Sequence, residues 1–168
     1  RIINGKLVVI GTFSYKYNNQ STGMYVDKYE NQVVELNGST WSSLSYQFPN
    51  DCITACISPQ GTVYGYVQWI NSFTQQYESK AYVMQPGMAA IETTESLPQL
   101  VTDKGDHIMI RASKNGTDHE IHTRAGETGE WKATGTKFTP PVPYGNIRLA
   151  MTNGRLALVF HSEVYVIQ

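Results

Sequence analysis

Histidine and carboxylate side chains lie closest together in the sequence at His119, Glu120 and His122. Imidazole nitrogens and carboxylate oxygens bind metals and transfer protons, so this cluster is the first candidate for chemistry. The stretch reads as a strand, in which successive side chains point to opposite faces. Glu120 and His122 then share one face and His119 lies on the other. We therefore expect a solvated strand, with metal binding as the lesser alternative, and we read His107 and His161 as ordinary strand residues.

Two cysteines, Cys52 and Cys56, are the only thiols of the chain. They also fall in a segment that reads as a strand, where a spacing of four places them on one face but roughly 13 Å apart. A disulfide cannot span that distance. The spacing predicts free thiols that pack as small hydrophobic side chains. A metal site is the weaker alternative, because the chain has no second cysteine pair to complete the ligand set.

Hydrolytic chemistry would need residues that the sequence does not group together. A glycoside hydrolase uses two carboxylates on either side of the scissile bond, and no nucleophile elbow, phosphate loop or metalloprotease helix is present. The arginines follow no motif and are scattered over the chain: Arg1, Arg111, Arg124, Arg148 and Arg155. We expect no catalytic residue, no metal and no cofactor. A glycosidase-like hydrolase is the least favoured function, and it would require paired carboxylates in a pocket.

Aromatic side chains in polar segments give the better candidates for binding. Residues 15–23 and 70–77 are rich in Tyr, Asn, Gln and Ser and read as loops longer than a tight turn. Such loops on a rigid scaffold often carry recognition, although a merely solvated hairpin tip is the alternative. An aromatic ring beside amide and hydroxyl groups can stack on a sugar or anchor a protein. The predicted ligand-binding residues are Trp69, Tyr15, Tyr17, Phe73 and Tyr77.

Charge and hydropathy narrow the possible partners. The formal net charge is −1 and no run of Lys or Arg occurs, so neither nucleic acid nor an anionic membrane surface is favoured. The longest apolar stretches, residues 7–10 and 156–160, have the length of strands, and we expect no membrane insertion. Charged residues make up 16% of the chain, against roughly 25% in typical domains. With so many Ser, Thr, Asn, Gln and Tyr residues, this composition favours an extracellular or virion-surface location.

A repeated unit organises these candidates. Four turns contain glycine, at Asn4-Gly5, Gln60-Gly61, Lys104-Gly105 and Asn153-Gly154, and their glycines are 56, 44 and 49 residues apart. Each turn is followed by an apolar strand, at residues 7–13, 63–69, 108–112 and 156–161. A second strand comes next, at residues 24–29 (or as far as 36), 80–84, 119–123 and 164–167. A period of about 40 to 50 residues is that of four-stranded blades.

The interval after tryptophan is the most specific part of the repeat. Seven residues lead from Trp41 to Phe48, which precedes Pro49, and seven lead from Trp131 to Phe138, with proline close behind. A proline cannot donate to a strand ladder and marks a break between sheets. A further strand then leads into the next glycine turn, at residues 52–58, 100–103 and 147–152.

This pattern resembles the blades of kelch-like and Asp-box-type β-propellers. The segment Asn37-Gly38-Ser39-Thr40-Trp41 is similar to an Asp-box turn, with Asn37 in place of the family's aspartate. The resemblance implies an all-β, β-propeller-like array of about three and a half to four antiparallel blades, with units at residues 1–48, 49–97, 98–139 and 140–168 of a single domain or propeller fragment. The repeated position of Trp41 and Trp131 predicts that they pack in the core between blades, with ligand contact as the lesser alternative. A β-sandwich is the alternative fold.

The last repeat lacks its tryptophan turn and fourth strand. The N-terminus could complete that sheet, or other chains could do so, because an open sheet would expose unpaired edges. The first functional hypothesis is a non-catalytic recognition or adhesion module that binds a glycan or a protein surface, in a secreted or phage-tail protein. The alternative is a structural domain that assembles with other chains.

Overall fold

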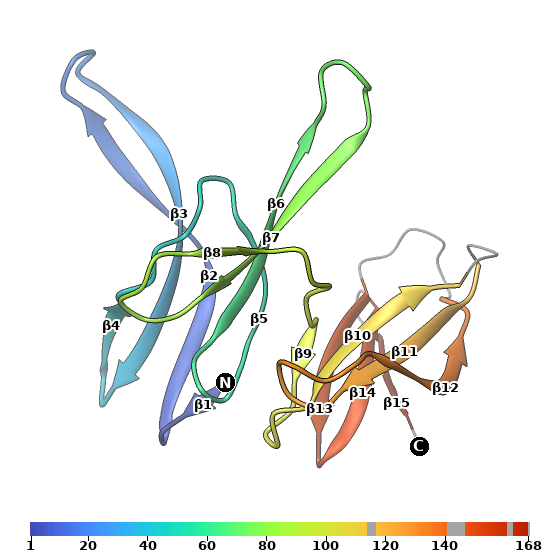
Figure 1. Ribbon diagram of the computed structural model, residues 1–168. Coiled ribbons are helices and arrows are strands. Elements are labelled where there is room, and N and C mark those ends of the chain that lie inside the picture. Colours follow the sequence, from blue (N-terminus) through green and yellow to red (C-terminus); the bar gives the residue numbers. More distant parts are fainter. Residues whose placement is uncertain (114–116, 141–146, 161–162, 168) are drawn as a thin grey trace. The chain divides into compact units, whose positions relative to one another are not determined.

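The computed structural model describes residues 1–113, 117–140, 147–160 and 163–167. It contains strands and turns, and no helix occurs in the residues described. The strands form four small antiparallel sheets that follow one another along the chain (Figure 1). The expected fold class, an all-β array of β-propeller-like blades, is therefore confirmed.

Each sheet is built from consecutive strands. The first contains β1 (Ile2–Ile3), β2 (Lys6–Asn19), β3 (Met24–Asn37) and β4 (Thr40–Leu44), and the second contains β5 (Ile53–Ile57), β6 (Val63–Ile70), β7 (Tyr77–Met84) and β8 (Ile91–Thr93). The third contains β9 (Leu100–Val101), β10 (His107–Ala112), β11 (His119–Arg124) and β12 (Lys132–Phe138), and the fourth contains β13 (Ile147–Thr152), β14 (Arg155–Phe160) and β15 (Glu163–Val166). In the described residues each strand pairs only with strands of its own repeat, which gives four separate small sheets and not the two layers of the β-sandwich alternative.

The chain divides into two compact units. Arg1–Glu95 holds the first and second sheets, and Ser96–Gln168 holds the third and fourth. The predicted strand at residues 156–161 corresponds to β14, and its last residue, His161, lies outside the described part of the chain.

All four predicted glycine turns adopt the left-handed backbone that glycine favours. The φ angles are +76° at Gly5, +86° at Gly61, +87° at Gly105 and +73° at Gly154. In the first and fourth sheets the preceding asparagine is left-handed too, with φ of 50° at Asn4 and 48° at Asn153. Two successive positive φ values are the mark of the two-residue type I′ hairpin, which the Asn-Gly sequence predicts.

The glycine turns of the second and third sheets are five residues long and share one hydrogen-bond pattern. Ser58 N donates to Thr62 O at 2.8 Å, and Thr62 N donates back to the Ser58 hydroxyl at 3.0 Å. In the same way, Thr102 N donates to Asp106 O at 2.8 Å, and Asp106 N donates back to the Thr102 hydroxyl at 3.0 Å. The two middle repeats therefore share a turn that differs from the Asn-Gly turn of the first and last.

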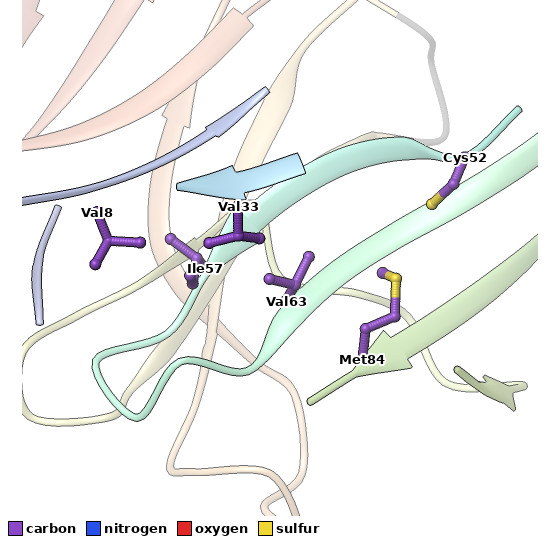
Figure 2. Packing of buried hydrophobic residues seen from close by; sticks show 6 residues of the cluster. All are labelled: Val8, Val33, Cys52, Ile57, Val63 and Met84. Carbon is purple, nitrogen blue, oxygen red and sulfur yellow. The ribbon is translucent and has the colours of Figure 1, made fainter. Parts of the chain in front are cut away.

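The core of the first unit lies between its two sheets. Figure 2 shows six buried side chains that gather there: Val8, Val33, Cys52, Ile57, Val63 and Met84. They come from β2, β3, the residue before β5, β5 itself, β6 and β7, so both sheets of the unit contribute. Burial of apolar surface of this kind stabilises the unit by roughly 25 cal/mol per Å² removed from water.

In the second unit, aromatic rings join the third and fourth sheets. The Phe138 ring at the end of β12 contacts the Phe160 ring at the end of β14 edge to face, with 6.1 Å between centroids. Phe160 in turn meets the Tyr165 ring of β15 at 5.5 Å. Phe138 is the residue that ends the interval after Trp131 in the repeat. Its contact with Phe160 joins the third sheet to the fourth.

The segment of residues 15–23 differs from the expected loop. β2 continues to Asn19, and β3 begins at Met24, so only the turn itself lies outside the ladder. The polar residues form strands because each finds a backbone partner across the hairpin, such as Tyr15 opposite Lys28. In Figure 1 this β2–β3 hairpin and the β6–β7 hairpin extend as two arms beyond the rest of the first unit.

Trp41 does not pack in the core, contrary to the expectation from the repeat. It is 49% exposed and lies on β4 opposite Leu36. Alternation along β4 puts Leu44 on the core side of the sheet, against Val33, and Trp41 on the other side. There it lines a shallow apolar groove with Val9, Phe13, Gln32, Val34 and Ser43.

The N-terminal strand does not complete the fourth sheet. β1 pairs with β2, Ile2 lying opposite Leu7. Arg1 extends this pairing, because its ammonium group donates to Val8 O at 2.8 Å and Val8 N donates to Arg1 O at 2.7 Å. The guanidinium of Arg1 reaches the second sheet and donates to Ile57 O at 3.1 Å.

Candidate functional site

The predicted binding aromatics of the second sheet lie on the β6–β7 arm. Trp69 is partly buried near the end of β6, opposite Glu78, and Tyr77 opens β7. Phe73, at the tip, is 96% exposed. None of the three lines the clefts of about 770, 470, 400 and 200 Å³ that the described residues form. Trp69 pairs with Glu78 and Tyr77 with Ile70, so the Trp69 and Tyr77 side chains lie on opposite faces of the arm.

Asn71 orders the tip that presents Phe73. Its side-chain oxygen accepts hydrogen bonds from Phe73 N at 2.9 Å and Thr74 N at 3.2 Å. Its backbone N donates to Gln76 O at 2.9 Å, which closes the loop. An Asx turn of this kind fixes the backbone locally, so Phe73 is held at the end of the arm.

Tyr15 and Tyr17 belong to β2 on the other arm. Their backbones pair with Lys28 and Val26 of β3, while their side chains lie outside the described part of the chain. The structure therefore does not bring the five predicted aromatics into one site, and their role in binding stays a prediction.

A polar cleft of about 770 Å³ lies at the base of the β2–β3 arm. Its walls come from β2, β3 and the connection that leads from the first sheet to the second. It combines three aromatic rings with hydroxyl, amide and carboxylate groups, and its lining residues are Thr12, Tyr29, Glu30, Asn31, Tyr46, Phe48, Pro49, Asn50, Asp51 and Cys52.

The first sheet creates this cleft because one face of β3 runs from the core out into the arm. Val33, Asn31 and Tyr29 are two residues apart and share that face. Val33 is completely buried and Asn31 partly buried, whereas Tyr29 is 67% exposed. The cleft therefore begins where the core ends, and the Tyr29 ring stands at its solvent side.

Asn31 fixes the junction between the two walls. Its side-chain oxygen accepts a hydrogen bond from the Thr12 hydroxyl at 2.8 Å, and its side-chain nitrogen donates to Cys52 O. Residues 49–52 form a turn in which Cys52 N donates to Pro49 O at 3.3 Å and Asp51 has a φ of 57°. The turn exposes Asn50 and Asp51 beside the arm.

The floor of the cleft is aromatic. The rings of Tyr46 and Phe48 lie 6.2 Å apart and are tilted by 33°. The Tyr46 hydroxyl donates to Gly61 O, which ties the connection to the glycine turn of the second sheet. Burial raises the pKa of Tyr46, so it stays a neutral hydrogen-bond donor at physiological pH. The cleft can thus offer ring faces together with polar groups that donate and accept hydrogen bonds.

The histidine cluster is arranged as its strand spacing predicts. Glu120 and His122 share a face, with 3.8 Å between Glu120 Oε2 and His122 Nε2. Their side chains are only 22% and 16% exposed, so this face is partly buried, and the expectation of a solvated strand is wrong. His119 lies apart from them and stacks on Phe138, the ring centroids being 5.7 Å apart. Within the described ranges no group of three or more His, Cys, Asp or Glu residues could hold a metal ion.

Both cysteines are free thiols, as their spacing predicts. Cys52 is buried, and Cys56 is partly buried. The pairing of β5 shifts register between Thr54 and Cys56, which interrupts the regular alternation that the sequence spacing assumes. Burial raises the pKa of Cys56 to about 12, against a smaller opposing effect of the Arg1 charge. A protonated, buried thiol is unreactive, so neither cysteine has the character of a nucleophile.

A second cleft, of about 470 Å³, lies in the second unit. Arg124 is buried and lines this cleft. Its guanidinium lies 5.0 Å from the centre of the Trp131 ring, a cation–π contact made by the second tryptophan of the repeat. The same guanidinium donates to the buried ring of His107. Because its partners are protein groups, we read this arrangement as structural.

The cleft residues escaped the sequence-based interpretation because they come from separate stretches. Tyr29, Glu30 and Asn31 lie mid-strand, where alternating polar residues indicate only a solvated face. Asn50 and Asp51 lie about twenty residues later in a proline turn. One signal was available. The tryptophan interval ends at Phe48, and the following Pro49-Asn50-Asp51 marks the turn that leads from the first sheet to the second.

In the described part of the chain, no helix is long and apolar enough to cross a membrane. Comparison of the chain with protein-family models, with curated proteins and with solved structures found no match in any of the three.

Proposed function

We propose that this protein is a non-catalytic recognition module that binds a glycan in the cleft at the base of the β2–β3 arm. The observation that carries the proposal is the exposed Tyr29 ring beside the amide and carboxylate groups of Asn31, Asn50 and Asp51 in one open cleft. A sugar ring has an apolar face that stacks on an aromatic ring and hydroxyls that pair with amides and carboxylates. A mainly apolar drug-like ligand would find few partners there.

The scaffold suits recognition because the cleft is built on paired strands. Tyr29 and Asn31 lie within the β2–β3 ladder, and the Asn31 side chain already bonds to both walls. Groups held in this way lose little conformational freedom when a ligand binds, which supports affinity. The same argument favours specific binding over loose contact by a mobile loop.

Glycoside hydrolysis is a second candidate, since Glu30 and Asp51 both line the cleft. Hydrolysis needs one carboxylic acid that keeps its proton at neutral pH, and an apolar, buried surrounding provides that. Asp51 is exposed and Glu30 is partly exposed. This favours binding of the intact sugar.

The exposed aromatics on the arms are part of the proposal. Trp69, Phe73 and Tyr77 on one arm, with Tyr15 and Tyr17 on the other, would contact parts of a longer glycan or of a glycoprotein that extend beyond the cleft. The sequence likeness to kelch-like and Asp-box blades concerns the scaffold that carries these arms, in which Gly38 of the Gly38-Ser39 turn between β3 and β4 has a φ of 61°. A location on the cell or virion exterior, where glycans occur, belongs to the same proposal.

A glycan array followed by calorimetric titration of the hits tests the proposal on the full chain. The Tyr29→Ala variant should weaken binding about five- to 150-fold, if stacking of a sugar on the ring is worth as much as stacking of a nucleic-acid base, roughly 1–3 kcal/mol. Tyr25→Ala is the matched control: Tyr25 lies on the same strand and is 68% exposed, but it is not part of the cleft. Its affinity should equal that of the wild type.

Two further variants separate the alternatives. Phe73→Ala should leave short oligosaccharides unaffected and weaken only longer ligands. Glu30→Gln combined with Asp51→Asn should reduce binding, and no release of reducing sugar should be detected with the wild type. Failure of every glycan to bind, or equal losses from Tyr25→Ala and Tyr29→Ala, would refute a glycan site in this cleft.

A further inference from the structure

The cleft at the base of the β2–β3 arm has acidic groups in its lining and no basic ones. Of the described residues that line it, Glu30 and Asp51 are acidic, and none is lysine, arginine or histidine. A basic side chain in the cleft would offset the field of these carboxylates. Because the lining provides none, the charge of a ligand affects how tightly it binds there, and a positive charge is favoured over a negative one.

Asp51 is the carboxylate that a ligand can reach. It is exposed, and its side chain makes no hydrogen bond or ion pair with the described residues. Its backbone is left-handed, with φ of 57°, a conformation that asparagine and aspartate adopt more readily than most residues with a side chain. The bond from Cys52 N to Pro49 O closes this turn, and Asn31 binds Cys52 O. The turn therefore holds an unpaired carboxylate at the wall of the cleft.

The ring of Tyr29 adds a second preference for positive charge. The face of an aromatic ring is the negative part of its quadrupole and attracts a cation within about 6 Å. In the second unit Arg124 satisfies such a face, with its guanidinium 5.0 Å from the centre of the Trp131 ring. Tyr29 is 67% exposed, and no cation of the described residues covers it. Its face is therefore open to a cation that a ligand supplies.

We propose that this cleft selects amino sugars, that is, glycans whose rings carry a free, protonated amine in place of a hydroxyl or an N-acetyl group. The inference rests on the proposed glycan site and names the class of glycan that it takes. An amino sugar keeps the apolar ring face that stacks on Tyr29, and its ammonium group is attracted to the Asp51 carboxylate and to the aromatic ring. An N-acetyl group is uncharged, and a uronic acid brings a second negative charge to Asp51, so both bind less tightly.

Calorimetric titration of the full chain with two tetrasaccharides measures this preference. One consists of β-1,4-linked glucosamine and the other of β-1,4-linked N-acetylglucosamine, at about pH 6, where amines and water-exposed carboxyl groups are both charged. An exposed ion pair strengthens binding roughly 1.4- to fivefold, and an exposed cation–π contact about two- to fivefold. We therefore expect the glucosamine tetrasaccharide to bind about three- to 25-fold more tightly. Screening by about 1 M NaCl should reduce this preference.

Asp51→Asn identifies the carboxylate that is responsible. Asparagine has nearly the same shape and tolerates the left-handed backbone, so the variant changes chiefly the charge. The ratio of the two affinities should fall by roughly 1.4- to fivefold. Glu130→Gln is the matched control, because it removes one negative charge from an exposed residue of the second unit that does not line this cleft. That variant should keep the wild-type ratio.

Two further probes define the class of ligand. A tetrasaccharide of β-1,4-linked mannuronate should bind more weakly than the N-acetylglucosamine tetrasaccharide. Tetralysine has an amine on every side chain but no sugar ring, so it should bind more weakly than the glucosamine tetrasaccharide.

The inference is overturned if the glucosamine tetrasaccharide does not bind, or binds no more tightly than every other probe. Equal effects of Asp51→Asn and Glu130→Gln on the affinity ratio would also overturn it. If glycans of other kinds still bind and lose affinity in Tyr29→Ala, the glycan site stands and only its selectivity for amino sugars is wrong. If no glycan of any class binds, the proposed function fails as well.

Discussion

The guanidinium group of Arg124 bonds to the buried ring of His107, with Nε and Nη2 at 3.2 and 3.1 Å from the same ring nitrogen, Nδ1. A guanidinium has only donors, so Nδ1 accepts and the ring carries its proton on Nε2. Trp131 covers the same cation at 5.0 Å from its ring centre. β10, β11 and the residue before β12 are thereby joined by one buried side chain.

This arrangement predicts that arginine is needed at position 124. Arg124→Lys keeps the charge but loses the planar contact with Trp131 and one of the two bonds to His107. We expect the free energy of unfolding to fall by about 2 kcal/mol, measured by urea denaturation. Arg111→Lys is the control, since Arg111 is exposed and its guanidinium donates to Ser96 at 3.3 Å. Equal effects from the two variants would contradict a structural role for the cluster.

Gly65 lies where the core of the first unit approaches the β6 backbone most closely. A Cβ atom there would stand 2.8 Å from Cys52 Sγ and 2.9 Å from Ile53 O. Gly65→Ala should therefore destabilise the protein by about 2 kcal/mol through overpacking. Gly11→Ala is the matched strand control, because a Cβ at Gly11 meets nothing within 4 Å. Urea unfolding should show that change to be neutral or slightly stabilising, and a neutral Gly65→Ala would contradict the packing described for β5 and β6.

Alkaline pH should weaken the fold through Cys56. Its pKa is raised by burial from 9.0 to about 12, so the thiol ionises more readily in the unfolded chain than in the folded one. The stabilising effect is complete below pH 9 and is lost as the pH rises toward 12. Between those values the free energy of unfolding of the wild type should fall more steeply than that of Cys56→Ala, by up to about 1.4 kcal/mol per pH unit. Parallel pH profiles from urea unfolding would contradict the burial of this thiol.

Much of the fold followed from the sequence because turn chemistry is local. Gly5, Gly61, Gly105 and Gly154 were identified by residue type and spacing, and each has the predicted positive φ. The length of the β2–β3 arm was not predictable in the same way. Its outer half lacks apolar alternation, and it is a strand only because the opposite strand supplies hydrogen-bond partners. Trp41 was misassigned for a related reason, since its spacing to Phe48 does not reveal which side of the sheet it takes.

The candidate cleft depends on long-range geometry. Tyr29 and Asp51 line one cleft only because the connection after β4 folds back on β3, and the bond from Asn31 to Cys52 holds it there. The aromatics Trp69, Phe73 and Tyr77 could be predicted because they lie in or beside a polar segment, where an aromatic residue stands out in the sequence. The sequence could therefore identify an exposed arm, but not the hollow beside another one.

The matching five-residue turns of the second and third sheets make the chain modular at those points. Residues 58–62 and 102–106 begin with a hydroxyl residue that accepts from the fifth backbone amide, at 3.0 Å in both turns, and have glycine in the fourth place. One loop could be transplanted into the other's position without altering the number of residues between its strands. The short Asn-Gly connections are not interchangeable with them, because such an exchange would change the loop length by three. Engineered insertions that preserve blade spacing should therefore be designed within a class of turn.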